Sequence, residues 1–274
     1  MENKRCVITG GNSGIGKATA TELARLGASI TLVCRDEAKG EAAVADIQQQ
    51  SGNAQIDLIN ADLASLDSVR QLAATIDERF EQLDVLVNNA GVMCEKRQTS
   101  ADGFELQWAV NHLAPLLLTR LLQEPLAAAG GRVVNVSSQV HRMGLIQLDD
   151  LQWQQKYKMF KSYGQSKLAL IMASNHLAKA WQGLGITVNC LHPGVIATNL
   201  GGTPKLMKLF LRGPEAGART SIYLASDPAV AGISGQYFIN CKPAKTSAAA
   251  QDSKIADKVW NISCEMIGLP AEIS

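Results

Sequence analysis

The sequence predicts an α/β protein in which one doubly wound parallel sheet is covered by helices on both faces. Short apolar runs alternate with longer helical patterns along the chain, which is the order that strand–helix–strand crossovers produce. The runs themselves, such as Cys6-Val7-Ile8 and Val85-Leu86-Val87, are apolar without alternation, as expected of strands buried on both faces. We therefore expect a seven-stranded parallel sheet flanked by helices.

The individual elements follow from these patterns. The strands are expected at Arg5–Thr9, Ser29–Cys34, Ala54–Asn60, Asp84–Asn88, Arg132–Ser137, Ile186–Leu191 and Gln236–Ile239. The helices are expected near Gly16–Leu26, Asp36–Gln50, Ser65–Phe80, Asp102–Leu122, Phe160–Trp181 and Pro214–Ala225. Two stretches, 142–159 and 199–212, do not fit the alternation. The second carries an apolar patch and predicts either a lid over a ligand or a surface excursion with its own small core.

Length, composition and charge fit a single domain without nucleic-acid or membrane partners. The chain has 274 residues, of which 46% are hydrophobic, and this suffices for one sizeable core. A net charge of +1 provides no electrostatic footprint for nucleic acid or an anionic membrane. No signal segment precedes the first strand, and no run of about 18 apolar residues occurs, so we expect no membrane anchor.

The cysteines and histidines predict no metal site. None of the six cysteines forms a CxxC pair, and the four histidines lack the spacing of metal ligands. Several cysteines lie inside apolar runs, where a buried reduced thiol is the ordinary state. Reduced thiols favour a cytoplasmic protein.

A glycine-rich turn after the first strand predicts a dinucleotide site. The segment from Thr9 to Gly16 contains four glycines and lies between that strand and a helix. Glycine lets the backbone turn tightly and approach a pyrophosphate, and the start of the helix offers free N–H groups to the phosphates.

The end of the second strand bears on the choice of cofactor. Arg35 can offer a planar fork to the 2′-phosphate of NADP. Asp36 is open to two interpretations, because it can bind the ribose hydroxyl of NAD or cap the next helix. We expect NADP(H) to be favoured over NAD(H).

These residues resemble the short-chain dehydrogenase/reductase family, whose marks recur in order along nearly the whole chain. The matching segments are Thr9–Gly16, Asp62-Leu63, Asn88-Asn89-Ala90-Gly91, Asn111, Ser137-Ser138, Tyr163 to Lys167, and His192-Pro193-Gly194 with Ile196 and Thr198. Other segments, such as Val110–Leu113 and Ser234–Phe238, are similar to the retinol-dehydrogenase-like branch of the family. The chain departs from that branch at Ala114-Pro115-Leu116, where the branch usually reads Gly-His-Phe.

The resemblance implies a single Rossmann domain over residues 1–274 that both binds the dinucleotide and carries the catalytic groups. It implies a lid near 199–212 and a C-terminal helical tail near 250–269. The implied cofactor-binding residues are Gly10, Asn12, Ser13, Gly14, Ile15, Gly16, Arg35, Asp62, Leu63, Asn89, Ala90, Gly91, Tyr163, Lys167, Pro193, Gly194, Ile196 and Thr198. The family often forms a homodimer or homotetramer through its last two long helices, and the tail is expected to cover either that surface or the substrate mouth.

The implied catalytic residues are Ser138, Tyr163, Lys167 and Asn111. Tyr163 is expected to act as general acid/base. The ordinary pKa of its phenol is about 10. This pKa must fall by about three units for the phenol to lose its proton near neutral pH. Lys167 lies one helical turn away, so its charge is expected to favour the phenolate. Ser138 is expected to hold the substrate oxygen, and Asn111 to hold a water next to Lys167.

The expected activity is the NADP(H)-dependent interconversion of a carbonyl and an alcohol on an apolar small molecule. Met143, Trp153 and the apolar patch near 206–210 suggest an apolar substrate, although core packing explains them equally well. One alternative is a non-enzymatic NADP(H)-sensing regulatory protein on the same fold. Another is a biosynthetic reductase acting on a carrier-bound substrate.

Overall fold

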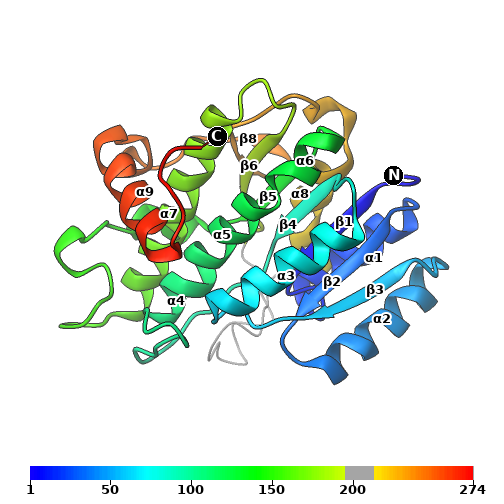
Figure 1. Ribbon diagram of the computed structural model, residues 1–274, viewed down its shortest axis with the longest axis horizontal. Coiled ribbons are helices and arrows are strands. Elements are labelled where there is room, and N and C mark those ends of the chain that lie inside the picture. The colour runs from blue at the N-terminus through cyan, green and yellow to red at the C-terminus, as the bar shows by residue number, and fades with distance from the viewer. Residues whose placement is uncertain (195–212, 274) are drawn as a thin grey trace.

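The computed structural model describes residues 1–194 and 213–273. They form three layers, with a twisted sheet between two layers of helices (Figure 1). The strand order is β3-β2-β1-β4-β5-β6-β7-β8. The order reverses between β1 and β4, which makes this the switch point of a doubly wound sheet.

Seven of these strands are mutually parallel, which confirms the predicted sheet. They are β1 (Arg5–Thr9), β2 (Ser29–Cys34), β3 (Ile56–Asn60), β4 (Val85–Asn88), β5 (Arg132–Val136), β6 (Thr187–His192) and β7 (Tyr237–Ile239). An eighth strand, β8 (Lys242–Pro243), pairs antiparallel with β7, so the predicted count of seven was one short. Two residues, one of them a proline, are too few to show a strand pattern in sequence.

The helices divide between the two faces of the sheet. On one face lie α1 (Gly14–Arg25), α2 (Glu37–Ser51) and α8 (Pro214–Ser226), whose apolar residues share one core with β1 and β2. On the other lie α3 (Leu66–Arg79), α5 (Ala114–Leu121), α6 (Gln123–Ala129) and α7 (Met159–Ala180), around a second core. Both cores contain residues of the central strands, because those strands are buried on both faces.

The helix predicted at Asp102–Leu122 begins later and is interrupted. It consists of a short turn, α4 (Leu106–Trp108), a π-helical turn, η1 (Ala109–Leu113), and then α5. The Glu105 carboxylate accepts hydrogen bonds from the backbone N–H groups of Gln107 and Trp108 and so caps the start of α4. Asp102 accepts instead from Leu66 N–H, at the start of α3, and therefore lies outside the helix.

The stretch predicted to be irregular after β5 holds two 3₁₀ turns, η2 (Gln139–Met143) and η3 (Leu148–Asp150). The C-terminal part holds η5 (Pro228–Val230), η6 (Ala248–Gln251) and α9 (Ser253–Ile267). α9 packs against α7 and η1 on the outside of the molecule (Figure 1). Trp260 of α9 stacks on His176 of α7, with the ring centroids 3.9 Å apart. No helix in the described ranges is both long and apolar enough to cross a membrane.

Candidate active site

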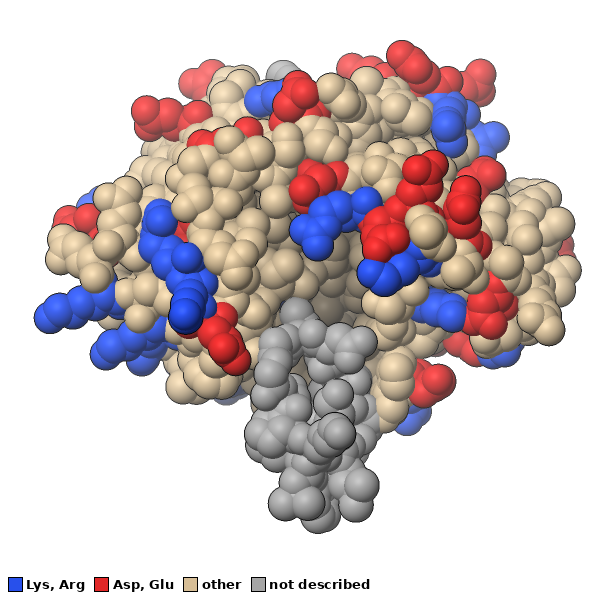
Figure 2. All heavy atoms as spheres, turned by 90° about the horizontal axis from the view of Figure 1, so that it is seen from below, with Lys and Arg blue, Asp and Glu red and all other residues tan. Residues whose placement is uncertain are grey.

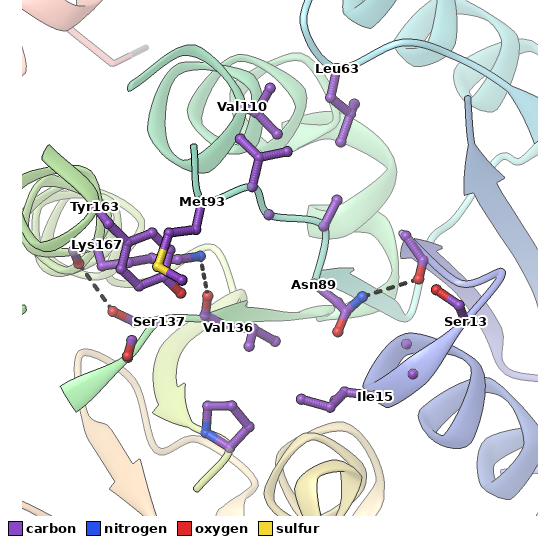
Figure 3. A pocket seen from close by; sticks show the side chains of 18 of the residues that line it. Ser13, Ile15, Leu63, Asn89, Met93, Val110, Val136, Ser137, Tyr163 and Lys167 are labelled. Carbon is purple, nitrogen blue, oxygen red and sulfur yellow. Dashed lines mark hydrogen bonds between the residues drawn. The ribbon is translucent and has the colours of Figure 1, made fainter. Parts of the chain in front are cut away.

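A cavity of about 1030 Å³ lies at the carboxyl ends of the parallel strands, around the switch point between β1 and β4. This is where open parallel sheets bind ligands, because the connecting loops diverge there. The cavity opens as a hollow near the centre of the face seen in Figure 2, with Lys and Arg side chains at its edge. It extends from the glycine-rich turn to Tyr163 and Lys167 of α7 (Figure 3).

The glycine-rich turn forms one end of the cavity. Gly10 and Gly14 have φ angles of 65° and 54°, in the left-handed region that favours glycine. A Cβ on Gly16 would lie 2.3 Å from the Gly10 carbonyl oxygen and 2.4 Å from Asn89 Nδ2. The Asn89 amide in turn donates to the Thr9 carbonyl over 2.8 Å, which joins this turn to the end of β4. Only glycine at position 16 permits this packing.

The first turn of α1 faces the cavity with free backbone donors. Ser13 is the N-cap residue, yet its side chain makes no capping hydrogen bond. Asn12, Ser13, Gly14 and Ile15 all line the cavity. N–H groups at a helix start that no side chain uses are suited to bind phosphate oxygens.

Two cations and a capping carboxylate lie at the end of β2. Arg35 and Lys39 are exposed and line the cavity. The Asp36 side chain accepts from Lys39 N over 3.1 Å and from Lys39 Nζ over 2.5 Å, so it is the N-cap of α2. These hydrogen bonds from Lys39 hold the pKa of the Asp36 carboxyl below its usual range. Of the two sequence-based interpretations of Asp36, the geometry shows the helix cap.

The two serines at the end of β5 differ in their surroundings. Ser137 is 2% exposed, and its hydroxyl donates to the Lys167 carbonyl over 3.0 Å (Figure 3). Ser138 is half-buried and lines the cavity, and its Oγ accepts from Val140 N–H. A hydrogen bond from the Ser138 side chain also lowers the pKa of the Tyr163 phenol, against the effect of burial. Ser138 is thus the serine that faces the reactive phenol.

Tyr163 is buried in the cavity wall, and burial raises the pKa of its phenol to about 12, against the hydrogen bond from Ser138. This differs from the expectation that Lys167 lowers that pKa. The Lys167 ammonium donates to the Val136 carbonyl over 2.8 Å and lies 5.8 Å from the centroid of the Tyr163 ring (Figure 3). Removal from water therefore outweighs the Ser138 hydrogen bond at the phenol. Burial also lowers the pKa of Lys167 to about 8.

Asn111 lies in the π-helical turn η1 and is fully buried. Its amide donates to the Val92 carbonyl and to Ser166 Oγ, and its Oδ1 accepts from Val92 N–H. A Cβ on Gly91 would lie 3.2 Å from Asn111 Oδ1 and 3.4 Å from Lys167 Nζ. Asn111 therefore ties the loop after β4 to α7 beside the lysine ammonium, with Gly91 keeping the space between them open.

Most of the remaining expected cofactor residues line the same cavity. They are Asp62, Leu63, Asn89, Ala90, Gly91, Pro193 and Gly194. Ile196, Thr198 and the predicted lid at 199–212 lie outside the described residues. None of the described residues of the C-terminal tail lines the cavity, because the tail packs on the outside of α7.

An apolar set of side chains that the sequence only partly indicated also lines the cavity. It comprises Met93, Leu106, Val110, Val140, Met143 and Phe160. Met143 had been singled out from the sequence, whereas Trp153, named beside it, is buried and does not line the cavity. Lys39 and His192 also line the cavity and were not assigned to the site from the sequence. His192 directly precedes the expected cofactor residues Pro193 and Gly194, so the signal for it was present in that segment, whereas Lys39 lies inside a helix pattern that carries no such motif.

The donor set fits a nicotinamide dinucleotide. The glycine cradle has no room for a Cβ at Gly16, and the helix start beside it offers unused N–H groups. Cations lie at one end of the cavity, and a phenol with a buried ammonium lies at the other. Within the described ranges, no group of three His, Cys, Asp or Glu side chains is arranged to hold a metal ion.

Comparison with known proteins places this geometry in a family. The profile of the short chain dehydrogenase family matches residues 4–206. Retinol dehydrogenase 13 of Homo sapiens is 44% identical over 286 aligned positions, covering 99% of this chain and 86% of that protein.

Two solved structures illustrate the shared fold. A protein of unassigned function from Mycobacterium paratuberculosis is 32% identical with a TM-score of 0.82, covering 99% of this chain and 96% of its own. A putative NAD(P)-dependent gluconate 5-dehydrogenase from Beutenbergia cavernae, with bound NADP, is 27% identical with a TM-score of 0.73. That match covers 88% of this chain and 96% of the gluconate dehydrogenase.

Proposed function

The chain belongs to the short-chain dehydrogenase family, in its retinol-dehydrogenase-like branch, and on that premise we propose that it reduces an apolar aldehyde or ketone with NADPH. Family membership makes it an oxidoreductase that acts on CH–OH groups. The cofactor, the role of each side chain and the nature of the substrate are the proposed part. The observation that carries the proposal is a cavity lined by half-buried Ser138, by buried Tyr163 and Lys167, and by a set of apolar side chains.

The residues that would hold the nicotinamide cofactor follow from the cavity. Backbone N–H groups of the turn at Asn12–Ile15 would bind the pyrophosphate, and Asp62 and Leu63 would contact the adenine. Asn89, Ala90 and Gly91 would contact the cofactor along the end of β4, and Pro193 and Gly194 the nicotinamide. When bound, the nicotinamide ring supplies or accepts the hydride.

Tyr163 is proposed to donate the proton that a carbonyl oxygen requires as it becomes an alcohol. A phenol whose pKa lies near 12 is fully protonated at neutral pH, which is the state required of a general acid. The Ser138 hydroxyl, hydrogen-bonded to the phenol, would hold the substrate oxygen beside it. The protonation state of the described site therefore favours the direction of carbonyl reduction.

Lys167 would stabilise the phenolate that remains after proton transfer. Its ammonium, 5.8 Å from the ring centroid, is the nearest cation among the described side chains that line the cavity around Tyr163. With a pKa of about 8 it is mostly protonated at pH 7 and can give up a proton without a large free-energy cost. Asn111 and Gly91 would keep space beside this ammonium for a water.

Preference for NADPH rests on the charges at the end of β2. Arg35 offers a planar guanidinium toward the cavity, and Lys39 adds a second cation. The one carboxylate there, Asp36, is engaged in capping α2 and pairing with Lys39, so it is not free to bind a ribose hydroxyl. A related solved structure carries bound NADP, which agrees with this assignment.

The substrate is proposed to be an apolar small molecule. The apolar side chains that line the cavity, those of Met, Leu, Val and Phe residues, favour hydrocarbon over polar groups. Pockets of this kind select mainly by shape and apolar area.

Steady-state oxidation of NADPH and of NADH, with a panel of apolar aldehydes and ketones, tests the proposal. We expect turnover with NADPH, and a loss of at least about 1000-fold in kcat for Tyr163→Phe, because the hydroxyl alone is removed. Tyr223→Phe, on α8 at the opposite face of the sheet, serves as the matched control and should retain full activity. NADPH binding without turnover of any carbonyl, unchanged in Tyr163→Phe, would overturn the proposal in favour of an NADP(H)-sensing protein.

A further inference from the structure

Two histidine side chains hydrogen-bond the two polar atoms of a single peptide unit near the Tyr163 phenol. This pair of contacts is the histidine grip. The peptide joins Ser138 to Gln139, where β5 ends and η2 begins. Nδ1 of His141 lies 2.7 Å from the carbonyl oxygen of this peptide, and Nδ1 of His192 lies 3.3 Å from its nitrogen. Both polar atoms of one peptide are therefore bound by imidazole rings, one from η2 and the other from the end of β6.

The partners of His141 fix its tautomer. A carbonyl oxygen can only accept, so Nδ1 of His141 carries a proton and donates to Ser138. The backbone N–H of Ser247 donates to Nε2 over 3.2 Å, so Nε2 carries no proton. Both ring nitrogens are satisfied only in this neutral form. A proton on Nε2 would bring two N–H groups face to face and break the contact with the C-terminal segment.

The partner of His192 fixes its state in the same way. The N–H of Gln139 donates to Nδ1, so Nδ1 is the unprotonated nitrogen and Nε2 carries the proton. Protonation of Nδ1 would set an N–H against the N–H of Gln139. The peptide would then lose the bond that holds its nitrogen.

The surroundings also disfavour charge on either ring. His141 is 0% exposed and His192 is 7% exposed. The groups that face the pair are Arg142 on the same turn, the Tyr237 ring 5.1 Å from His141, and, behind that ring, Tyr163 and Cys190. Each histidine also faces the other. No carboxylate is among these described groups, so nothing would compensate an added positive charge.

Burial shifts both titrations in the same direction. It lowers the pKa of His141, and it lowers the pKa of His192 to about 4. Both rings are therefore neutral at pH 7 in the folded protein. Both rings therefore protonate below the ordinary histidine pKa of about 6.5.

We propose that His141 and His192, in their neutral forms, are positioning residues that hold the Ser138 hydroxyl against Tyr163. Protonation of His192 frees the peptide nitrogen, whereas protonation of His141 removes the Ser247 contact that fixes its ring and leaves its donor to Ser138 in place. The Ser138 side chain adjoins this peptide, and within the turn its Oγ accepts from Val140 N–H over 3.2 Å. The Ser138 carbonyl also accepts from the His141 backbone N–H over 3.1 Å, so loss of the imidazole contacts weakens mainly the hold on the peptide nitrogen. Ser138 Oγ can then move away from the substrate oxygen. The proposal rests on the proposed reaction, in which Ser138 orients that oxygen.

This arrangement predicts that kcat for carbonyl reduction falls at acid pH. Tyr163 and Lys167 do not produce this acid limb of the pH profile. Tyr163 stays protonated as the pH falls, and Lys167 becomes more fully protonated, so neither residue slows the proton donation. A loss of kcat as the pH falls from 7 toward 4 would therefore report protonation of the histidine pair.

The first arm of the test needs no turnover. Long-range ¹H–¹⁵N correlation spectra of the whole protein, without cofactor, report the tautomer and titration of each histidine. We expect the Nδ1–H form for His141 and the Nε2–H form for His192, with both midpoints below 6.5. The opposite tautomer, or a midpoint at or above 6.5 for either ring, would overturn the grip even if the protein proves not to be a reductase.

The second arm separates positioning from stability. His192→Ala is expected to lower kcat about 10-fold at pH 7.5, with the KM values of carbonyl and NADPH within about 2-fold. His192→Asn places a non-titrating acceptor oxygen where Nδ1 lies and should recover most of kcat and abolish the contribution of His192 to the acid limb. His141→Asn keeps a donor at the Nδ1 position and should flatten the limb further.

His176→Asn, on α7 but stacked on Trp260 away from the turn, is the matched histidine control and should leave the profile unchanged. An acid limb that persists in the His141→Asn/His192→Asn double variant would refute the proposal. So would a His192→Ala variant with undiminished kcat.

Discussion

The two ends of the cavity offer different kinds of chemical groups to a ligand. At the nucleotide end, backbone atoms of the glycine-rich turn and two exposed cations, Arg35 and Lys39, provide the contacts. At the reaction centre, the side chains of Tyr163 and Lys167 are buried and hydrogen-bonded, and their pKa values are shifted. The first end is close to water and depends on charge and backbone shape. The second is shielded from water and depends on fixed side-chain geometry.

This difference separates binding from chemistry. Changes at the nucleotide end should alter cofactor affinity and its dependence on salt, since exposed charges are screened. Changes at the reaction centre should alter turnover and its dependence on pH, because buried groups titrate far from their ordinary values.

The largest effect is expected at Gly16. In Gly16→Ala the new methyl group would lie 2.3 Å from the Gly10 carbonyl, so the turn must open and the N–H groups of α1 lose their alignment. We expect the Kd for NADPH to rise at least about 100-fold in calorimetric titrations. Gly14→Ala is the matched control, because a Cβ there meets nothing within 4 Å and only the φ of 54° is strained. Equal NADPH affinities of Gly16→Ala and Gly14→Ala would contradict the role of Gly16 in shaping the turn that binds the cofactor.

A middle-sized effect is expected at Arg35. Arg35→Ala removes a charge-assisted contact to the 2′-phosphate and should raise the Kd for NADPH about 10- to 100-fold, with the Kd for NADH unchanged. Lys39→Ala should weaken NADPH binding less, because the Lys39 ammonium is already paired with Asp36. Fluorescence titrations at two salt concentrations measure both variants. Equal weakening of NADH and NADPH by Arg35→Ala would refute the assignment of the 2′-phosphate.

The smallest effect is expected at Asp36. Asp36→Ala removes the N-cap of α2 and should lower the melting temperature by about 2 °C. It should leave the KM for NADH within about 2-fold, since the carboxylate is not the ribose ligand in this geometry. A rise of ten-fold or more in that KM, with the melting temperature unchanged, would restore the alternative interpretation of Asp36.

The sequence predicts the nucleotide end better than it predicts the surroundings of the reaction centre. The strand β1, the turn to Gly16 and the start of α1 are consecutive, so local patterns reveal them. The seven parallel strands were predictable for the same reason. The start of α4 was not predictable from sequence. Glu105 and Asp102 can each cap a helix, and α4 begins after Glu105 because Asp102 accepts instead from Leu66 N–H.

The grip on the Ser138 peptide illustrates what sequence cannot reveal. His192 lies 53 residues from its partner Gln139, and Ser247 lies 106 residues from His141. Such contacts depend on the order of strands and on the path of the C-terminal segment. The expected cytoplasmic location and the homodimer or homotetramer stay predictions, as does the lid at 199–212.

Single-turnover kinetics most directly test the separation of binding from chemistry. Tyr163→Phe and Arg35→Ala would each be saturated with NADPH, mixed with an apolar aldehyde and followed by the absorbance of the reduced nicotinamide. We predict that Tyr163→Phe binds NADPH with wild-type affinity but fails to oxidise it, whereas Arg35→Ala at saturation oxidises it at close to the wild-type rate. The reverse pattern, or equal loss in both variants, would contradict the account.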